Sequence, residues 1–447
     1  MEIAVIGTGY VGLVSGACFS EFGFNVTCVD KDLEKIKRLE NDEIPIFEPG
    51  LEDLVKKNHA AGRLHFTTDI ATSVKRADVI FIAVGTPSRR GDGAADLGYV
   101  DGAAQEIAEN LTGFTVIVTK STVPVGTARR IEAIVTKANA TADFEIASNP
   151  EFLREGSAIE DFMRPDRIVI GLEGERAKEV MRQLYRPLSL RDAPLLFTDL
   201  ETAELIKYAG NAFLATKITF INQIADLCEA VGANVKDVAK GIGLDGRIGS
   251  KFLHPGPGFG GSCFPKDTRA LAIIAQEADA PMSLVEAVVT SNDARKHNMC
   301  ARIISALGGD AHNKRVAILG VSFKPNTDDV RESPSLDIIP GLIKAGAKVS
   351  AYDPVAMAEA AKILNHVDWK KDAYSAAEEA DCVVILTEWN EFRALDLMKL
   401  AAVMKQPLLV DLRNIYTPEE IAQTPFTYHS IGCEVIRPQA ANLTVIK

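Results

Sequence analysis

The sequence predicts an α/β protein in which two Rossmann-like, doubly wound parallel-sheet domains are joined by a central region of long helices. Short Val- and Ile-rich runs alternate with helix-period segments from Glu2 to about Pro150, as expected of a parallel sheet covered by helices on both faces. The same alternation returns near residue 308. Between the two, residues 202–233 contain no proline and carry apolar side chains on nearly every face, which predicts one long buried helix.

The length of 447 residues exceeds the size at which a single hydrophobic core keeps growing. We therefore expect three parts: a first domain at 1–195, a helical region at 196–307 and a last domain at 308–447. Further helices are predicted at 267–278 and 283–307 within the middle part, whose shape suits a dimer contact. A polar, glycine-rich linker, LGGDAHNK, precedes the last domain.

Strand-like segments in the first and last domains occur in the same order. The first domain contains EIAVIG, NVTCVD, RLHFTTD, ADVIFIAV, TVIVTKS and FEIASNP, continued by RIVIG and LLFTD. The last domain contains RVAILG, KVSAYDP, ADCVVILTEW and PLLVDLRN, which match four of these segments in sequence. Convergence on strand composition is an alternative, but the shared order favours a structural repeat.

Composition and charge narrow the class of protein. The net charge of -12 argues against a nucleic-acid surface, and the apolar runs are much shorter than a membrane span requires. The first residues already predict a buried strand, which leaves no room for a signal peptide, so a cytoplasmic protein is expected. The seven cysteines show neither paired nor metal-ligand spacing, and we expect reduced core thiols at positions such as Cys18, Cys28 and Cys382, and no metal.

A dinucleotide fingerprint opens the chain. Gly7, Gly9 and Gly12 form G-x-G-x-x-G between a strand and a helix, which lets backbone N–H groups approach a pyrophosphate. Asp30 ends the next strand, at the separation expected of a carboxylate that binds the adenosine ribose, and this favours NAD over NADP. The alternative is that the glycines serve packing only and Asp30 is a turn residue. Lys35 is either a ribose neighbour or a solvated helix charge.

The last domain lacks this fingerprint. Its first strand is followed by G-V-S-F-K-P-N, with Gly320 but no second glycine. Lys324 and Arg331 lie near the strand ends where open α/β sheets bind ligands, so a phosphorylated or nucleotide ligand is expected there.

The loop GPGFGGSCFPKD contains the best candidate nucleophile. Cys263 ends a glycine-rich loop and is followed by Pro265, a residue favoured in the first turn of a helix. A helix N-terminus and the neighbouring Lys266 would both stabilise a thiolate, and Asp267 adds a carboxylate nearby. The alternative is a small residue packed under a glycine-rich turn.

Polar residues elsewhere suggest partners for this cysteine. Lys207 and Asn211 are four residues apart on the long buried helix and so share one face, although Lys207 could instead form a helix ion pair with Glu204. Thr122 in KSTVPVG, and Glu151 and Glu155 in NPEFLREG, follow predicted strands at the carboxyl edge of the sheet, where ligands gather. Taken singly, each of these three could be a helix-start residue without chemistry.

Together the motifs GTGYVG, KSTVPVG, NPEFLREG, ELIKYAGNAFLA, GFGGSCFPKD and GVSFKPNTDDVRESP resemble the UDP-glucose/GDP-mannose dehydrogenase family, over nearly the whole chain and closest to its bacterial UDP-glucose branch. The resemblance implies NAD-dependent oxidation of the C6 alcohol of UDP-glucose to UDP-glucuronate, with two NAD reduced per sugar. Cys263 would form a thiohemiacetal and then a thioester, which water hydrolyses.

The same resemblance implies roles for individual residues. Lys207 and Asn211 would stabilise charge on the reacting oxygen, Asp267 and Thr122 would position water or transfer protons, and Glu155 would assist hydrolysis. Arg247 would reach the substrate diphosphate across a homodimer interface. The implied cofactor contacts are Gly7, Gly9, Val11, Gly12, Asp30, Lys35, Thr86, Thr122, Glu155, Lys266 and Arg331. The implied substrate contacts are Glu151, Phe152, Leu153, Arg154, Glu155, Lys207, Asn211, Arg247, Phe252, Leu253, His254, Pro255, Gly256, Gly260 and Lys324.

Three alternatives stay open at this point. A relative acting on GDP-mannose or UDP-N-acetylmannosamine would share the cysteine loop and Lys-x-x-x-Asn. A 3-hydroxyacid or 6-phosphogluconate dehydrogenase would pair a Rossmann domain with a long helix carrying such a lysine, but it would release one NADH and need no Cys263. A non-catalytic sensor of NAD and nucleotide sugars would tolerate loss of the reactive groups, all of which are present here.

Overall fold

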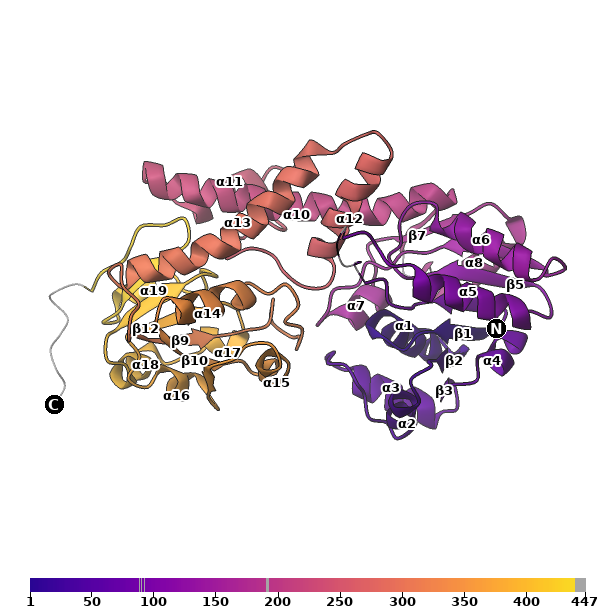
Figure 1. Ribbon diagram of the computed structural model, residues 1–447, viewed down its shortest axis with the longest axis horizontal. Helices are drawn as coiled ribbons and strands as arrows, with labels where there is room; N and C mark the ends of the chain where they lie inside the picture. The colour runs from indigo at the N-terminus through magenta and orange to yellow at the C-terminus, as the bar shows by residue number, and fades with distance from the viewer. Residues whose placement is uncertain (88, 90, 92, 190–192, 439–447) are drawn as a thin grey trace. The chain divides into compact units, whose positions relative to one another are not determined.

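The computed structural model describes residues 1–87, 89, 91, 93–189 and 193–438, which fold into two compact units (Figure 1). The first unit comprises Met1–Gly210 with Ile273–Ala280, and the second comprises Asn211–Ala272 with the chain from Pro281 onwards. The boundary at Gly210 and Asn211 falls inside helix α10 (Leu200–Val231), so this helix runs from one unit into the other. None of the helices in the described part of the chain has the length and apolar character needed to cross a membrane.

An eight-stranded sheet forms the centre of the first unit. Its order is β3-β2-β1-β4-β5-β6-β7-β8, and the neighbours are parallel except for β6 and β7, which pair antiparallel. Every segment predicted as a strand in this part is one: β1 (Glu2–Ile6), β2 (Asn25–Val29), β3 (Leu64–Thr67), β4 (Val79–Ile82), β5 (Thr115–Thr119), β6 (Phe144–Ser148), β7 (Ile168–Leu172) and β8 (Leu195–Thr198). The antiparallel step was not predicted, because strand composition does not encode strand direction.

Helices cover both faces of this sheet, because its strands are apolar on both sides. Ile3 and Val5 of β1 pack with α1 (Tyr10–Glu21), α2 (Leu33–Glu40), α3 (Leu51–Ala60), α7 (Ala158–Met163) and α8 (Glu175–Leu184). Ala4 and Ile6, which point the other way, pack with α4 (Ile70–Arg76), α5 (Gly98–Asn110) and α6 (Thr127–Ala138). The short helix α9 (Arg186–Ser189) precedes β8.

The second unit contains an all-parallel six-stranded sheet, β11-β10-β9-β12-β13-β14, whose six positions repeat the order of the first six strands of the first sheet. The four predicted strands are β9 (Arg315–Leu319), β10 (Lys348–Tyr352), β12 (Cys382–Ile385) and β13 (Leu408–Asp411). Two more, β11 (Val367–Trp369) and β14 (Thr427–Ser430), were not predicted because β11 has only three residues and β14, TYHS, is polar. The predicted fold class, with two doubly wound sheets joined by a long helix, is confirmed.

One face of the second sheet packs against α14 (Ser335–Lys344), α13 (Ser283–Ala306) and the C-terminal part of α10 (Figure 1). The other face packs against α16 (Ala373–Ala377), α17 (Asn390–Arg393), α18 (Leu397–Val403) and α19 (Pro418–Ala422). The remaining helices are α11 (Val235–Gly243), α12 (Phe264–Glu277) and α15 (Met357–Ala361).

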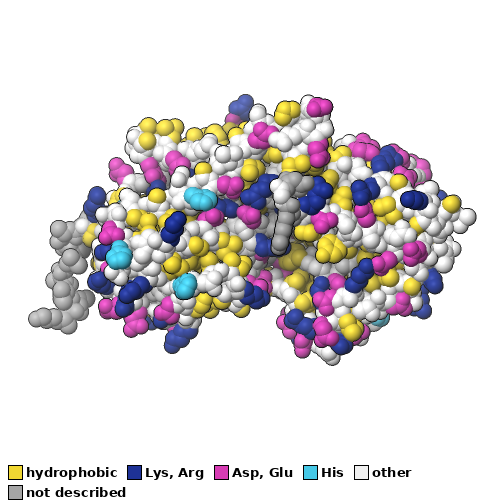
Figure 2. Space-filling view, viewed as in Figure 1, with side chains coloured by type: hydrophobic (Ala, Val, Ile, Leu, Met, Phe, Trp, Pro, Cys, Tyr) yellow, Lys and Arg dark blue, Asp and Glu magenta, His cyan; other side chains and the backbone are white. Residues whose placement is uncertain are grey.

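Charged side chains of both signs are interspersed over the face drawn in Figure 2. The net charge of -12 is therefore not gathered into one acidic patch on that face. An anionic ligand on that face would therefore be bound by local groups rather than by the field of a whole surface.

Candidate active site

The turn between β1 and α1 is shaped by glycines that each lack a side chain for a different reason. Gly7 adopts a φ of +102°, a region that favours glycine. A Cβ on Gly12 would lie 1.9 Å from the carbonyl oxygen of Gly7, so the helix can approach the turn only without one. Gly9 faces open space, with nothing within 4 Å of an added Cβ, and no side chain caps the N–H groups that follow it. Backbone donors and free space together fit a pyrophosphate.

Asp30, directly after β2, is held with its carboxylate charged. Its Oδ2 accepts hydrogen bonds from the Thr8 N–H at 3.0 Å and the Thr8 hydroxyl at 2.6 Å, and the Lys35 Nζ lies 3.0 Å away. Burial acts to raise the pKa of Asp30, but these bonds and one from the Asp32 N–H lower it to about 2. A permanently ionised acceptor at this point fits ribose hydroxyls, and Lys35 contacts Asp30 rather than solvent alone.

The equivalent carboxylate in the second unit has no capacity left for a ligand. Asp353, directly after β10, is fully buried and accepts six hydrogen bonds, from Val321, Ser322, Val355, Ala356 and Trp389. It therefore serves the fold, which is consistent with a second domain that does not bind a dinucleotide.

Two threonines meet where β4 and β5 end. The Thr86 hydroxyl donates to the carbonyl of Thr122 at 2.9 Å, and the adjacent Ser121 hydroxyl donates to the carbonyl of Val84 at 2.7 Å. These bonds fix the loop that presents the Thr122 side chain, which is only partly buried.

The Thr122 loop is also held by a carboxylate from α10. Glu204 accepts hydrogen bonds from the N–H groups of Gly126 at 2.6 Å and Ala128 at 2.8 Å, and it thereby caps α6. Burial raises the pKa of Glu204 to about 7 despite these two bonds. The carboxylate that could have paired with Lys207 within the helix is thus used elsewhere.

Lys207 forms a buried ion pair with Glu151, at 3.0 Å between Nζ and Oε1. Both side chains are only 4% exposed, so the charges are shielded from water and from competing ions. The second oxygen of Glu151 accepts the N–H of Leu153 at 2.5 Å, and the Phe152 ring lies under the guanidinium of Arg167 at 3.7 Å. The predicted residues Glu151, Phe152, Leu153 and Lys207 are therefore brought together.

A second buried lysine, Lys120, was not predicted as a site residue. It lies close enough to Glu151 and Lys207 for their charges to affect its pKa. Its Nζ donates to Asn149 Oδ1 at 3.0 Å and to the Tyr185 hydroxyl at 3.3 Å. Burial lowers the pKa of Lys120 to about 8, opposed by the charge of Glu151 and assisted by that of Lys207. A lysine directly after the apolar strand TVIVT was the available sequence signal.

Glu48 is another residue that sequence reasoning missed. Its carboxylate accepts the N–H groups of Gly156 at 2.5 Å and Ala158 at 2.7 Å and the hydroxyl of Tyr10. It thus fixes the backbone beside Glu155, which is itself partly buried. Arg154 instead forms an ion pair with Asp161 and is exposed.

In the second unit, Cys263 directly precedes α12, and its carbonyl accepts the N–H of Asp267 at 2.8 Å as the helix begins. The buried Asp267 carboxylate binds Asn211 Nδ2 at 2.6 Å and Lys266 Nζ at 2.7 Å. Cys263, Asn211, Lys266 and Asp267 are therefore neighbours. Lys266 pairs with Asp267, and the N-terminus of α12 is placed to stabilise a Cys263 thiolate.

Side chains of α10 and α13 form hydrogen bonds with the backbone of the glycine-rich loop before Cys263. Asn222 accepts the Gly256 N–H at 2.8 Å, Arg295 donates to the Gly256 carbonyl at 2.6 Å, and Asn292 binds both backbone groups of Phe259. Leu253, Pro255, Gly256 and Gly260 are buried, whereas His254 is exposed. Phe252 adopts a φ of +65°.

The predicted basic residues of the second unit differ in their surroundings. Lys324 lies over the Phe323 ring at 5.5 Å. Arg331 pairs with Asp329 and Arg247 with Asp245, and both arginine side chains are exposed, Arg247 by 90%. Arg413, which was not predicted, donates to the carbonyls of Leu386 and Phe323. Within the described residues, no three His, Cys, Asp or Glu side chains are arranged as metal ligands.

The chain matches three family models that cover most of its length. They are the NAD binding domain of the UDP-glucose/GDP-mannose dehydrogenase family at residues 1–189, its central domain at 201–294 and its UDP binding domain at 317–418.

Individual relatives agree with these models. The chain is 62% identical to UDP-glucose 6-dehydrogenase of Rhizobium meliloti over 97% of this chain and 99% of the relative, and 51% identical to one from Bacillus subtilis over 98% and 94%. A UDP-glucose dehydrogenase structure from Pyrobaculum islandicum matches with a TM-score of 0.89 at 36% identity, covering 97% and 98% of the two chains. A UDP-D-ManNAc dehydrogenase from Pyrococcus horikoshii matches with a TM-score of 0.84 at 26% identity, covering 97% and 99%.

The glycine turn leads to a paired prediction. Gly12→Ala should lower the free energy of unfolding by about 1–3 kcal/mol, because its Cβ would overlap the Gly7 carbonyl. Gly9→Ala should change it by less than about 0.5 kcal/mol, because Gly9 has a φ of -72° and open space around it. Urea unfolding of both variants tests this, and equal losses would contradict the assignment of close packing to Gly12 alone.

Glu204 should make stability depend on pH. A carboxyl group whose pKa is raised to about 7 on folding binds protons more tightly in the folded state, so it weakens the fold as pH rises from about 4.5 to 7. The Glu204→Gln protein lacks this carboxyl group. Its free energy of unfolding, relative to that of wild type, should therefore rise by up to about 3 kcal/mol as the pH increases through this window. Urea titrations at several pH values measure this difference, and parallel curves for the two proteins would refute it.

Proposed function

Because the chain belongs to the UDP-glucose/GDP-mannose dehydrogenase family, we propose that it oxidises UDP-glucose to UDP-glucuronate by removing four electrons at C6. The observation that carries this proposal is the position of Cys263 at the start of α12, beside a buried Asp267 that Asn211 and Lys266 hold. A one-step alcohol dehydrogenase has no use for such a thiol.

The family models and the relatives confirm three predictions: the family, the class of dehydrogenase and the cofactor NAD. We propose that residues 1–195 bind this cofactor, that 196–307 form the dimer contact and that 308–447 bind the UDP group. The three family models, which match similar segments, support this division.

The proposed chemistry has three covalent stages. NAD would supply the hydride acceptor in each of the two oxidations, one NAD molecule for each. After the C6 alcohol has lost a hydride and a proton, the Cys263 thiolate adds to the aldehyde carbon and gives a thiohemiacetal. Loss of a second hydride from carbon and of the hydroxyl proton leaves a thioester, and water then displaces the thiol to give the carboxylate. The hydroxyl that enters comes from water, and Cys263 is regenerated.

The pairing of the polar groups suggests what each contributes. Lys207 and Asn211 are proposed to stabilise negative charge on the reacting oxygen, as an ammonium and an amide donor do. Asp267 and Thr122 are proposed to orient water or transfer protons, with Glu155 assisting hydrolysis. Asp267 suits this role because Lys266 and Asn211 hold both its oxygens in place.

Recognition of the two ligands is proposed as the resemblance implies. We assign Gly7, Gly9, Val11, Gly12, Asp30, Lys35, Thr86 and Arg331 to the cofactor, and residues 151–155, 252–256, Gly260 and Lys324 to the substrate. The open space at Gly9 and the ionised Asp30 support the first set. Burial of the 253–260 backbone supports contacts through main-chain atoms rather than through the exposed His254.

We further propose a cytoplasmic homodimer. The α10 side chains Phe213, Phe220 and Leu227, spaced by seven residues, are exposed by 66%, 49% and 55%. Such spacing is typical of a helix that packs against another helix, and a second copy of α10 is the proposed partner. Arg247, which is exposed, is proposed to reach the diphosphate bound by that partner. A reactive Cys263 thiol suits a reducing compartment.

The proposed function predicts two NADH per UDP-glucose consumed, measured by absorbance at saturating NAD. Cys263→Ala should lower uronate formation by roughly 10³-fold or more, because the thiohemiacetal cannot form. Full turnover in that variant would refute the thioester, and one NADH per sugar would indicate a simple hydroxyl dehydrogenase. Two NADH from GDP-mannose or UDP-N-acetylmannosamine, and none from UDP-glucose, would move the chain to another branch.

The proposed dimer predicts that Phe220→Glu shifts the protein towards monomer, because a carboxylate would be buried in an apolar interface. Sedimentation velocity at micromolar concentration measures the shift. The matched control is Met398→Glu, at a residue on α18 that is 58% exposed, and it should leave the dimer intact. A Phe220→Glu protein that sediments like wild type would rule out α10 as the interface.

A further inference from the structure

Glu332 occupies an unfavourable backbone conformation in the segment between β9 and α14. Its φ is +53°, in the left-handed region that residues with a side chain rarely adopt. Such a conformation persists only where the surrounding structure fixes it, and it is most informative near functional sites. Because glycine would adopt this conformation more readily, a role for the Glu332 side chain is expected.

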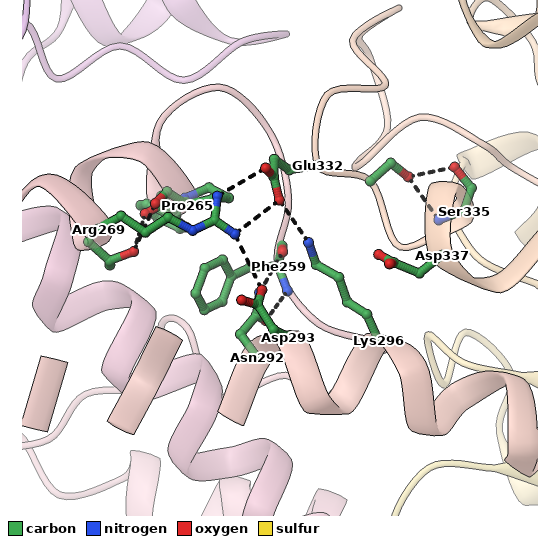
Figure 3. Close-up of polar contacts among 12 residues, drawn as sticks. Phe259, Pro265, Arg269, Asn292, Asp293, Lys296, Glu332, Ser335 and Asp337 are labelled. Atoms are coloured by element: carbon green, nitrogen blue, oxygen red, sulfur yellow. Dashed lines mark hydrogen bonds and ion pairs between the residues drawn. The ribbon is translucent and has the colours of Figure 1, made fainter. Parts of the chain in front are cut away.

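The Glu332 carboxylate joins two helices (Figure 3). Arg269 of α12 lies 3.0 Å from Oε1, and Lys296 of α13 lies 3.2 Å from Oε2. The Lys296 side chain is only 3% exposed, so its ammonium group depends on this carboxylate as a counter-charge. Burial acts to raise the pKa of Glu332, but Arg269 and Lys296 hold it below its usual value, so the group is ionised at neutral pH.

The backbone of the same segment lies against the loop that leads to Cys263. The N–H of Gly261 donates to the carbonyl of Arg331 at 2.8 Å. A Cβ on Gly260 would lie 2.4 Å from the carbonyl oxygen of Glu332, so this contact is possible only with glycine there. The segment therefore supports the loop two residues before the cysteine.

These contacts flank Cys263 on both sides along the chain. The loop before it rests on the backbone of Arg331 and Glu332, and the helix after it is tied to the Glu332 carboxylate through Arg269. Loop and helix are thus both attached to the two-residue segment Arg331–Glu332. A rigid support of this kind keeps a nucleophile within the small tolerance that attack on a carbonyl requires.

We infer that Glu332 is a positioning residue for Cys263, setting the thiol for the covalent half of the reaction without touching substrate or cofactor. This inference rests on the proposed function. The first oxidation does not involve the thiol, whereas the second oxidation and the hydrolysis do. The effect of Glu332 should therefore be confined to the later steps.

The test is single-turnover NADH formation from UDP-glucose, followed by stopped-flow absorbance, in wild type and Glu332→Gln. The glutamine keeps the shape of the side chain and removes its charge. We expect the first phase to stay within 2-fold of wild type and the second to slow by about 10-fold or more, with KM for UDP-glucose unchanged within 3-fold. Equal slowing of both phases, or of neither, would overturn the inference.

Two further variants control the experiment. Glu379→Gln makes the same change at an exposed glutamate with a φ of +56°, directly before Ala380, and should leave both phases unaltered. Arg269→Gln breaks the tie from Glu332 to α12, together with the 3.4 Å contact of Arg269 with Asp293, while Lys296 keeps its counter-charge. It should reproduce the selective slowing. It also serves as the test if Glu332→Gln does not fold.

Amide hydrogen exchange separates this inference from the proposed function. In Glu332→Gln the Gly261 amide should exchange at least 10-fold faster, whereas the Phe259 amide, which Asn292 holds, should not change. Unchanged exchange at Gly261 would overturn the inference whatever the activity. If wild type forms no NADH from UDP-glucose, the proposed function fails, and exchange still decides whether Glu332 supports the loop.

Discussion

Buried charge must be paired or hydrogen-bonded, and this constraint determines where the candidate catalytic groups of both units can stand. Lys207 is held by Glu151, and Asp267 is held by Asn211 and Lys266. Glu151 and Asn211 are each 56 residues away from the charged group that they hold, whereas Lys266 directly precedes Asp267. The long helix α10 contributes Lys207 to the first set and Asn211 to the second.

The two sheets show how one architecture can be fitted to two uses. Both place a carboxylate directly after their second strand, Asp30 in one and Asp353 in the other. Asp30 retains acceptor capacity at a partly exposed edge, whereas Asp353 is consumed by six internal hydrogen bonds. The turns that follow the first strands of the two sheets also differ. Gly9 faces open space in the first unit, whereas the second unit has no glycine at the equivalent position. The turn and the carboxylate after the second strand are thus open in the first sheet, whereas in the second sheet the equivalent carboxylate is used by internal contacts.

The sequence was sufficient to predict the fold class because period-2 and period-3.6 patterns are local and strong in strands such as EIAVIG and in the helix at 202–233. It did not reveal the antiparallel pairing of β6 and β7 or the short strand β11, because neither has a local signal. The glycine-rich loop motif was sufficient to indicate Cys263, and the spacing of Lys207 and Asn211 on the long helix was sufficient to indicate these two residues. Glu48, Lys120 and Glu332 were not predicted, because their significance lies in partners 29 to 110 residues away in the sequence.

The pKa shifts indicate which buried groups are present at a cost to stability. Burial moves Lys120 down to about 8 and Glu204 up to about 7, so in both cases folding disfavours the charged form. Apolar residues of similar volume would avoid this cost. Lys120 borders the Glu151 loop, and Glu204 caps the helix that follows Thr122. Both groups border loops to which the proposed chemistry is assigned, as expected of a site that holds buried charge.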